Sequence, residues 1–210
     1  MQQEGSIHPA RLTVDYPDRE LNRSSTFFRL FAAIPIMFVL ASVGGWTWQA
    51  TYENGKEAAA AGGVLFFGPL LMILFRQKYP RWWFDFNLQL TRFSTRVMSY
   101  LALMSDRYPS TDEEQSVHLD LDYPDVKQDL NRFMPLVKWL LAIPHYIVLL
   151  FLGIAAVFAV IIAWFAILFT GRYPRGIFQF VEGVMRWGLR VEAYSMLLVT
   201  DRYPPFKLAA

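Results

Sequence analysis

Long apolar runs dominate the pattern of hydrophobic and polar positions along this chain. Residues 27–43 are apolar apart from Arg29 and a few small polar residues, and residues 58–75 are apolar throughout. The segment between them, residues 46–56, is polar and rich in aromatic side chains, which concentrate at the depth of lipid headgroups. The pattern predicts a hairpin of two membrane-spanning helices over residues 27–75, joined by an external loop.

A second apolar run lies in the other half of the chain. No Lys, Arg, Asp or Glu occurs between Trp139 and Gly171. A single helix of that length would measure about 50 Å, against a hydrocarbon core of about 30 Å. We therefore expect a second transmembrane hairpin over residues 133–170, with two short spans that turn near Gly153. A re-entrant hairpin that does not fully cross the bilayer is the alternative.

Each predicted hairpin is followed by a segment with one polar stripe at helical spacing, which predicts amphipathic helices over residues 82–104 and 176–199. Paired arginines near the middle of a membrane span would cost several kcal/mol. We therefore expect both helices to lie flat at the cytoplasmic interface, with their apolar faces in the acyl boundary. The two stripes are formed by Asp85, Gln89, Arg92, Arg96 and Ser99, and by Gln179, Gly183, Arg186, Arg190 and Ala193.

Short stretches of alternating apolar and polar residues precede both hairpins. Residues 11–16 and 117–123 have this pattern, which predicts two short strands, each ended by a Tyr-Pro pair. Because an isolated strand or hairpin is marginal in water, each strand needs a partner. Three pairings are open: the two strands with each other, with another protein, or with the C-terminal segment that begins at Pro205.

The two halves of the chain repeat one another in order, which predicts tandem repeats over residues 10–109 and 117–208. An acidic linker, residues 110–116, joins the copies, and the first copy carries an insertion around residues 44–63. The matches are Asp-Tyr-Pro-Asp at 15–18 and 122–125, Leu-Asn-Arg at 21–23 and 130–132, Ala-Ile-Pro at 33–35 and 142–144, and Asp-Arg-Tyr-Pro at 106–109 and 201–204.

Composition and charge complete the expected fold class. Hydrophobic residues make up 54% of the 210 residues, more than a soluble domain of this size would bury. Of the 20 Lys and Arg residues, Lys56 alone falls in a loop between paired helices. Because Lys- and Arg-rich loops stay cytoplasmic, both termini are predicted to be cytoplasmic. We expect a mainly α, multi-pass protein of the bacterial inner membrane, with four transmembrane helices as two hairpins in a parallel tandem repeat.

Three motifs resemble the DUF4389 family, a bacterial membrane domain of unknown function. They are Gly171-Arg-Tyr-Pro-Arg-Gly176, Arg186-Trp-Gly-Leu-Arg190 and Thr200-Asp-Arg-Tyr-Pro-Pro-Phe206. The second copy resembles the family from about residue 122 to 208, and the first copy carries Gln77-Lys-Tyr-Pro-Arg-Trp82 at the matching place. The resemblance implies two tandem copies of this domain and agrees with the expected topology. It implies no activity, substrate or functional residue.

Basic side chains are the first candidates for a functional role, as contacts for lipid headgroups. A basic residue beside a membrane contributes about 1 kcal/mol toward anionic lipid. Arg29 and Lys138 occupy equivalent places near a helix start, from which their long stems can reach headgroups. The alternative is that the arginines bond local acids such as Asp85 or Glu182. The full candidate set is Arg29, Arg92, Arg96, Lys138, Arg186 and Arg190.

His145 is the one ionisable residue deep in an apolar run, and its equivalent in the first copy is Ile36. An intramembrane ionisable group is a functional hypothesis by default. We favour a structural histidine that caps the backbone opened by Pro144. The sequence contains no cysteine and none of the common nucleophile, metalloprotease, phosphate-loop or dinucleotide motifs. No catalytic residue, metal site or cofactor is therefore predicted.

These observations lead to one expected function and two alternatives. We expect a non-enzymatic polytopic membrane protein that serves as a scaffold or accessory subunit of a membrane assembly. Its expected partners are membrane lipids and another membrane protein or a second copy, with no nucleic acid. The first alternative is an anionic-lipid-binding or lipid-handling protein that uses the basic residues. The second is a small channel or transporter that uses His145. The two Asp-Arg-Tyr-Pro motifs are interpreted as helix stops.

Overall fold

The computed structural model describes residues 8–18, 20–44, 68–113 and 115–209. The predicted external loop of residues 46–56 and most of the predicted span at 58–75 lie outside them. Helices dominate the described residues, and they are accompanied by two short strands. The elements are β1 (Ala10–Val14), α1 (Arg23–Gly44), a π-helical turn η1 (Met72–Arg76), α3 (Arg81–Leu101), β2 (Val117–Leu121), α4 (Pro135–Leu141), α5 (Ile143–Thr170) and α6 (Arg175–Ser195).

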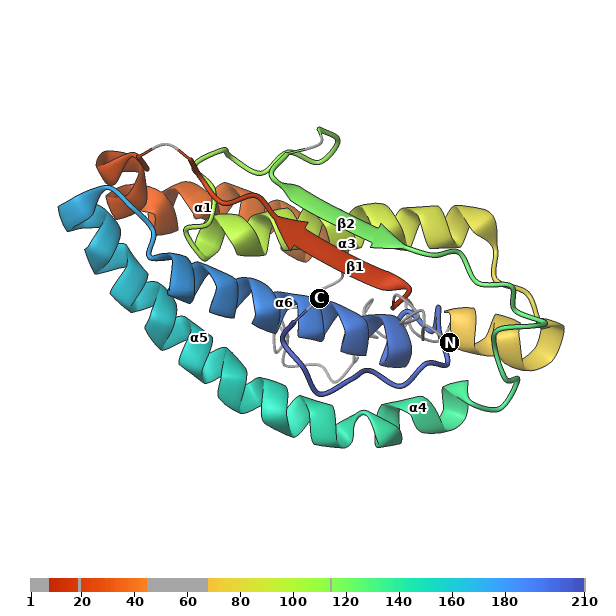
Figure 1. Cartoon of the computed structure of the whole chain (residues 1–210). Helices are drawn as coiled ribbons and strands as arrows, with labels where there is room; N and C mark the ends of the chain where they lie inside the picture. The colour runs from red at the N-terminus through yellow and green to blue at the C-terminus, as the bar shows by residue number, and fades with distance from the viewer. Residues whose placement is uncertain (1–7, 19, 45–67, 114, 210) are drawn as a thin grey trace, which may run out of the picture.

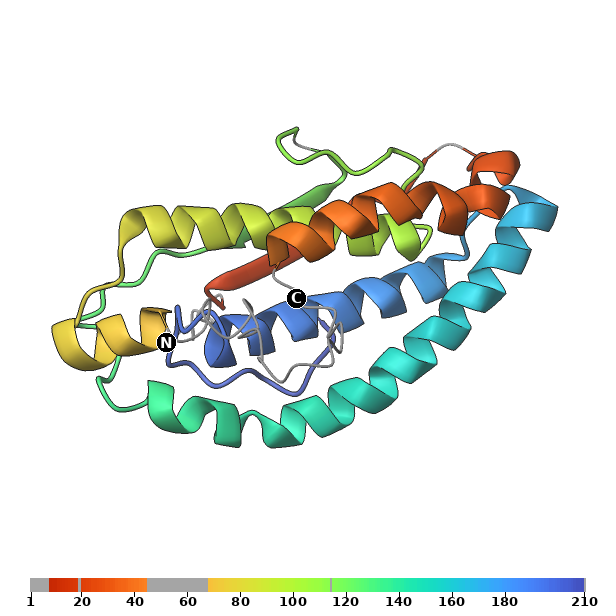
Figure 2. The same ribbon diagram turned by 180° about the vertical axis from the view of Figure 1, so that it is seen from behind.

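The main elements form a closed ring of contacts. Strand β1 pairs with β2, β2 packs on α3, α3 on α1, α1 on α5, α5 on α6, and α6 on β1. The strands lie in front in Figure 1. In Figure 2, which shows the molecule from the opposite side, α1 lies in front. The two most apolar helices, α1 and α5, therefore lie on the side of the ring opposite the sheet.

The predicted strands form, and the open question of their pairing is resolved. They pair with each other in antiparallel register, with Leu12 opposite Leu119. Each strand alternates buried and exposed residues, as the sequence pattern predicts. The buried side chains enter the main core together with residues of α3 and α6, including Phe84 and Phe178. A two-stranded sheet is stable here because two helices cover its apolar face.

The predicted amphipathic helices also form, as α3 and α6. Each begins directly after a proline, Pro80 or Pro174, whose backbone is extended. Proline suits this place because it lacks the N–H group that a first helical turn leaves unbonded. Shortly after the ends of the two helices, Leu103 (φ 64°) and Leu198 (φ 59°) adopt the left-handed conformation. This conformation reverses the chain at each helix end, where the N–H groups of Met104 and Val199 donate to the backbone oxygens of Ser99 and Ala193.

The predicted hairpin over residues 133–170 is wrong. Helix α5 continues without interruption through Gly153 for 28 residues, a length of about 42 Å. The chain bends instead at Ala142, between α4 and α5. A glycine costs a helix interior about 1 kcal/mol relative to alanine, which is too little to end a long helix without other turn residues. Pro144 is tolerated because it lies in the first turn of α5.

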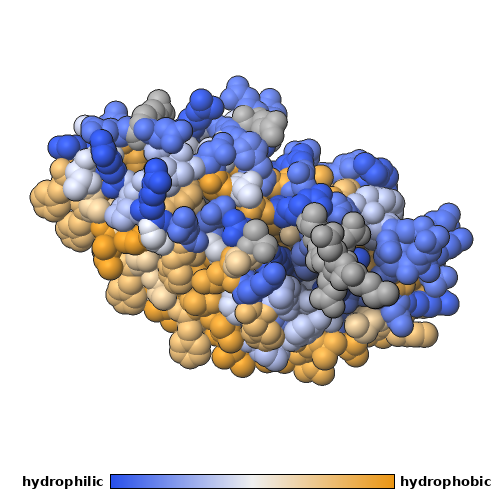
Figure 3. Space-filling view, viewed as in Figure 1, coloured by the Kyte–Doolittle hydropathy of each residue, from blue (hydrophilic) through white to orange (hydrophobic). Residues whose placement is uncertain are grey.

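The outer faces of α1 and α5 form a broad apolar surface. Their large side chains are well exposed, for example Phe31 at 70%, Phe38 at 76%, Phe158 at 63% and Phe169 at 77%. Figure 3 shows apolar residues gathered along α5 and polar residues on the side of the strands. Among the described residues, two helices are long and apolar enough to cross a membrane: Arg23–Ser42 and α5.

Two glycines of α6 provide a test of this packing. A Cβ atom at Gly183 would lie 2.9 Å from the Cβ of Leu208, whereas a Cβ at Gly188 would meet no heavy atom within 4 Å. Both substitutions to alanine gain the same helix propensity. We therefore expect Gly183→Ala to have a free energy of unfolding about 1–3 kcal/mol lower than Gly188→Ala. Thermal unfolding in detergent measures the difference, and equal stabilities would contradict the packing of the C-terminal segment on α6.

Candidate functional site

Two buried ion pairs hold the starts of the apolar helices. The side chain of Arg29 in α1 is 2% exposed and pairs with Asp106. The side chain of Lys138 in α4 is 0% exposed, and its Nζ lies 2.7 Å from Oδ1 of Asp201. The pKa of Lys138 is lowered from its usual value, because the effect of burial is larger than that of the hydrogen bond and the charge of Asp201, which raise it. Protein encloses both cationic groups, so the geometry of Arg29 and Lys138 favours ion pairs inside the protein over the predicted contact with lipid headgroups.

The two aspartates also bind the backbone shortly before a helix, directly before α1 and in the turn that leads into α4. Asp106 accepts a hydrogen bond from the backbone N–H of Asn22 at 2.8 Å. Asp201 accepts the same bond from Asn131. A carboxylate at a helix N-terminus is favourable because the first N–H groups have no partner within the helix. The Asp-Arg-Tyr-Pro motifs therefore do more than stop α3 and α6, since their aspartates anchor the next pair of elements.

The arginines of the two polar stripes bind the edges of the sheet. Arg92 Nε donates to the backbone oxygen of Leu119 at 2.8 Å, and Arg186 Nε donates to the backbone oxygen of Leu12 at 2.8 Å. Arg186 also donates to Glu182. This is the bond to a local acid that the sequence analysis gave as the alternative to lipid contact. Such contacts occupy strand edges that would otherwise be free to pair with another chain.

The second arginine of each stripe holds a neighbouring loop. Arg96 donates to the backbone oxygen of Ser110 at 3.1 Å, and Arg190 donates to that of Ala209 at 3.0 Å. Both side chains are buried. The placement of the four stripe arginines therefore agrees with bonding inside the protein and not with contact to lipid headgroups.

His145 is enclosed by aromatic rings at the junction of α5, α6 and the C-terminal segment. It is fully buried, and its Nδ1 accepts a hydrogen bond from Trp187 Nε1 at 3.2 Å. Its ring stacks on Phe206, with the ring centroids 4.0 Å apart. The histidine thus binds the indole of α6 and does not cap the backbone at Pro144. This placement joins α5 to α6, which is a structural role.

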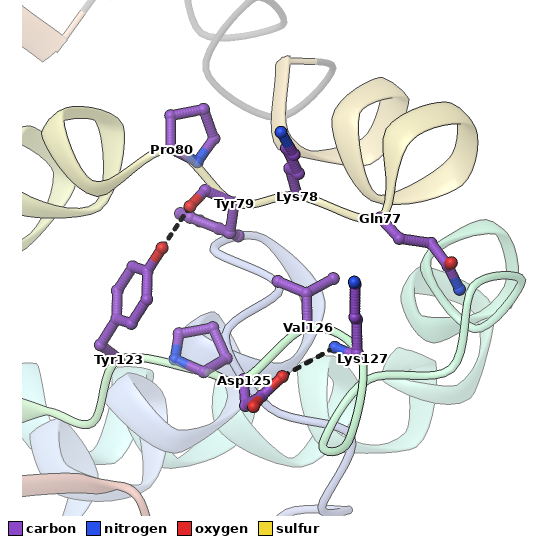
Figure 4. Close-up of a pocket in the computed structure, with 9 residues that line it drawn as sticks. Gln77, Lys78, Tyr79, Pro80, Tyr123, Asp125, Val126 and Lys127 are labelled. Carbon is purple, nitrogen blue, oxygen red and sulfur yellow. Dashed lines mark hydrogen bonds between the residues drawn. The ribbon is translucent and has the colours of Figure 1, made fainter.

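A hollow of about 600 Å³ lies where the end of η1 meets the turn after β2. Figure 4 shows Lys78 and Lys127 on its rim, and the hydroxyl of Tyr123 donating to the backbone oxygen of Tyr79. Both ammonium groups are available to an anion such as a phosphate, since both residues are exposed. Sequence reasoning missed this hollow. The signal was that its walls include two Tyr-Pro pairs, one from each half of the chain.

The described residues contain no cluster of side chains that is suited to bind a metal ion. No group of three or more His, Asp or Glu side chains that could hold a metal ion lies among those residues. The acidic residues near the strands bind protein groups instead. Asp122 pairs with Arg11, and Asp15 lies 3.1 Å from Nε2 of His118.

The buried ion pairs can be tested by removing one carboxylate. Asp201→Ala leaves the ammonium group of Lys138 buried without its charged partner, so we expect the free energy of unfolding to fall by about 3–5 kcal/mol. The matched control is Asp122→Ala, because the side chains of Asp122 and Arg11 are 54% and 47% exposed. That change should cost less than about 1 kcal/mol. Similar melting temperatures for the two variants in detergent would exclude an anchoring role for Asp201.

Comparison with known proteins gives one result for this region. Residues 135–207 match the family model of DUF4389, described as a domain of unknown function. The matched segment runs from the start of α4, through α5 and α6, to the turn after Asp201. No curated protein and no solved structure matches the chain. The DUF4389 family is therefore supported for the segment that contains Lys138, His145 and Asp201.

Proposed function

We propose that the protein is a non-enzymatic membrane module, which acts through its surfaces as a scaffold or accessory subunit of a membrane assembly. The observation that carries this proposal is the division of the surface into two sides. The outer faces of α1 and α5 are apolar. Figure 3 shows the apolar residues along α5 and the polar residues on the side of the strands. Exposed apolar areas much larger than a few hundred Å² mark a contact with lipid or with another protein.

The position of the charges favours a shallow placement in the membrane. Helix α6 packs along α5, and the sheet packs along α6. If α5 stood across the bilayer, exposed charges of the sheet such as Arg11 and Asp120 would lie at the depth of the hydrocarbon core. A charge at that depth costs about 2.5–3.5 kcal/mol or more. The cost disappears if α5 lies along the membrane plane, with its outer face in the acyl boundary.

The length of α5 agrees with this placement. At about 42 Å, the helix is longer than a hydrocarbon core of about 30 Å, and its 28 residues include no charged residue. A helix in the plane has no such limit on its length. The proposal therefore retains the expected bacterial inner membrane and the cytoplasmic polar side, because that side carries the basic residues. In place of the four predicted transmembrane helices, the proposal has apolar helices that enter the membrane from one side without crossing it.

The proposal also includes the duplication predicted from the sequence. Equivalent residues of the two copies make equivalent contacts, each with the opposite copy. The hydroxyl of Tyr16 donates to the backbone oxygen of Tyr173, and the hydroxyl of Tyr123 donates to that of Tyr79. Arg92 and Arg186 likewise each bind the strand of the opposite copy, at Leu119 and Leu12. Each copy thus completes the other, which supports two interlocked units with one common polar side.

Side-specific labelling tests the membrane placement, and the chain contains no cysteine to interfere. The variants are Gln128→Cys before α4 and Arg172→Cys after α5, both at exposed positions. We expect an impermeant thiol reagent to label both in inverted membrane vesicles and neither in intact cells. Thr13→Cys on the exposed face of β1 is the control for the cytoplasmic side. Labelling of positions 128 and 172 from opposite sides would mean that α5 crosses the membrane.

A scaffold must have a partner, which native purification can detect. We expect a second membrane protein, or a second copy of this chain, to remain bound in a mild detergent and to appear in native mass spectra. The interaction should survive the charge-neutral change His145→Leu, because His145 is enclosed and does not line the surface. A lone monomer in every detergent and at every expression level tested would overturn the scaffold role. Loss of ion transport in His145→Leu would favour the channel alternative.

A further inference from the structure

An apolar groove opens between α1 and α5. Its volume is about 590 Å³, within the range of small-molecule sites in proteins. The two helices meet at one end, where Trp164 Nε1 donates to the backbone oxygen of Thr26 at 3.2 Å. From there they diverge, and Figure 2 shows α6 in the interval between them. The walls include Leu30 of α1, Gly153, Ala156 and Val160 of α5, and Val181 and Met185 of α6.

Two polar atoms at the groove lack a hydrogen-bond partner among the described residues. They are Oγ1 of Thr26 and Nε of Arg29, which are both buried, and the two residues are among those that line the groove. Thr26 is 1% exposed and Arg29 is 2% exposed. The two residues are three positions apart on α1, so they lie on the same helix face. A buried polar group without a partner costs about 1–3 kcal/mol, which an acceptor bound in the groove would remove.

The charge of Arg29 determines which kind of acceptor fits. Its terminal nitrogens bind Asp106 and the backbone oxygens of Tyr100 and Ser105, so its positive charge is already balanced. An anionic ligand would meet a neutral ion pair and would add an uncompensated charge to an apolar site. An uncharged oxygen, such as an ester carbonyl, matches the remaining N–H group.

We propose that this groove binds one acyl chain of a membrane glycerolipid, with the ester carbonyl at Thr26 and Arg29. The inference rests on the proposed placement of the α1 and α5 faces in lipid, because the groove opens between these helices. A helix of a second copy is about 10–12 Å wide, so the volume would accommodate little more than one helical turn. A flexible acyl chain can occupy the whole groove and can follow the divergence of the helices.

Filling the groove tests the proposal. A Cβ atom at Gly153 would have no heavy atom within 4 Å, so Gly153→Leu extends into open space without a clash. The matched control is Ala155→Leu, which adds a similar side chain at an exposed position of the same helix. Each protein is reconstituted with dioleoyl phosphatidylethanolamine, and the lipid retained on delipidation is counted by native mass spectrometry. We expect one retained lipid for wild type and Ala155→Leu, and at least tenfold lower occupancy for Gly153→Leu.

A second variant examines the polar end of the groove. Thr26→Val removes the hydroxyl but keeps the shape of the side chain, so we expect retention to fall several-fold while the melting temperature stays close to wild type. This variant keeps the test decisive if Gly153→Leu fails to fold. Equal lipid occupancy in wild type, Gly153→Leu and Thr26→Val would overturn the acyl-chain site. The site would also be overturned if the wild-type protein were a dimer, and if Gly153→Leu dissociated this dimer without changing the amount of bound lipid.

The outcomes separate this inference from the proposed function. If positions 128 and 172 are labelled from one side but Gly153→Leu retains its lipid, the membrane module stands and the acyl-chain site fails. If the two positions are labelled from opposite sides but Gly153→Leu loses its lipid, the shallow placement fails and the groove still binds an acyl chain.

Discussion

The two buried cations of α1 and α4 are the constraint on which the rest of the structure depends. Arg29 and Lys138 have almost no exposed surface, and a buried charge without a partner destabilises a fold by several kcal/mol. Asp106 and Asp201 remove that cost only if the turn after α3 reaches α1 and the turn after α6 reaches α4. The two ion pairs therefore determine how each amphipathic helix lies against an apolar one.

The same requirement explains a strained backbone. Leu103 and Leu198 have positive φ angles, which cost a residue with a side chain about 1–2 kcal/mol. Each of them precedes its aspartate by three residues and buries its own side chain in the core. The left-handed residue reverses the chain early enough for the aspartate to reach the cation. Burial of the leucine and formation of the ion pair together offset the local strain.

Periodic patterns predicted much of this fold, whereas features without a local pattern were missed. Alternation located the strands, and the spacing of Arg92, Arg96, Arg186 and Arg190 located α3 and α6. The uninterrupted apolar run gave no sign of where its helix would bend, so Gly153 was mistaken for a turn. The partner of Arg29 lies 77 residues away, beyond any local signal. A signal did exist, because both cations and both aspartates recur at equivalent places in the two predicted copies.

Arg29 connects the buried charges to the apolar surface. Asp106 cancels its charge, while Nε keeps an N–H group without a partner among the described residues. Helix α1 therefore places a charge-balanced ion pair, and not a lone cation, beside the groove. A charge-balanced pair can lie beside an apolar surface at far lower cost than an unpaired charge. An arginine near the start of an apolar helix can thus be explained by the ion pair and the groove together, without any contact to a lipid phosphate.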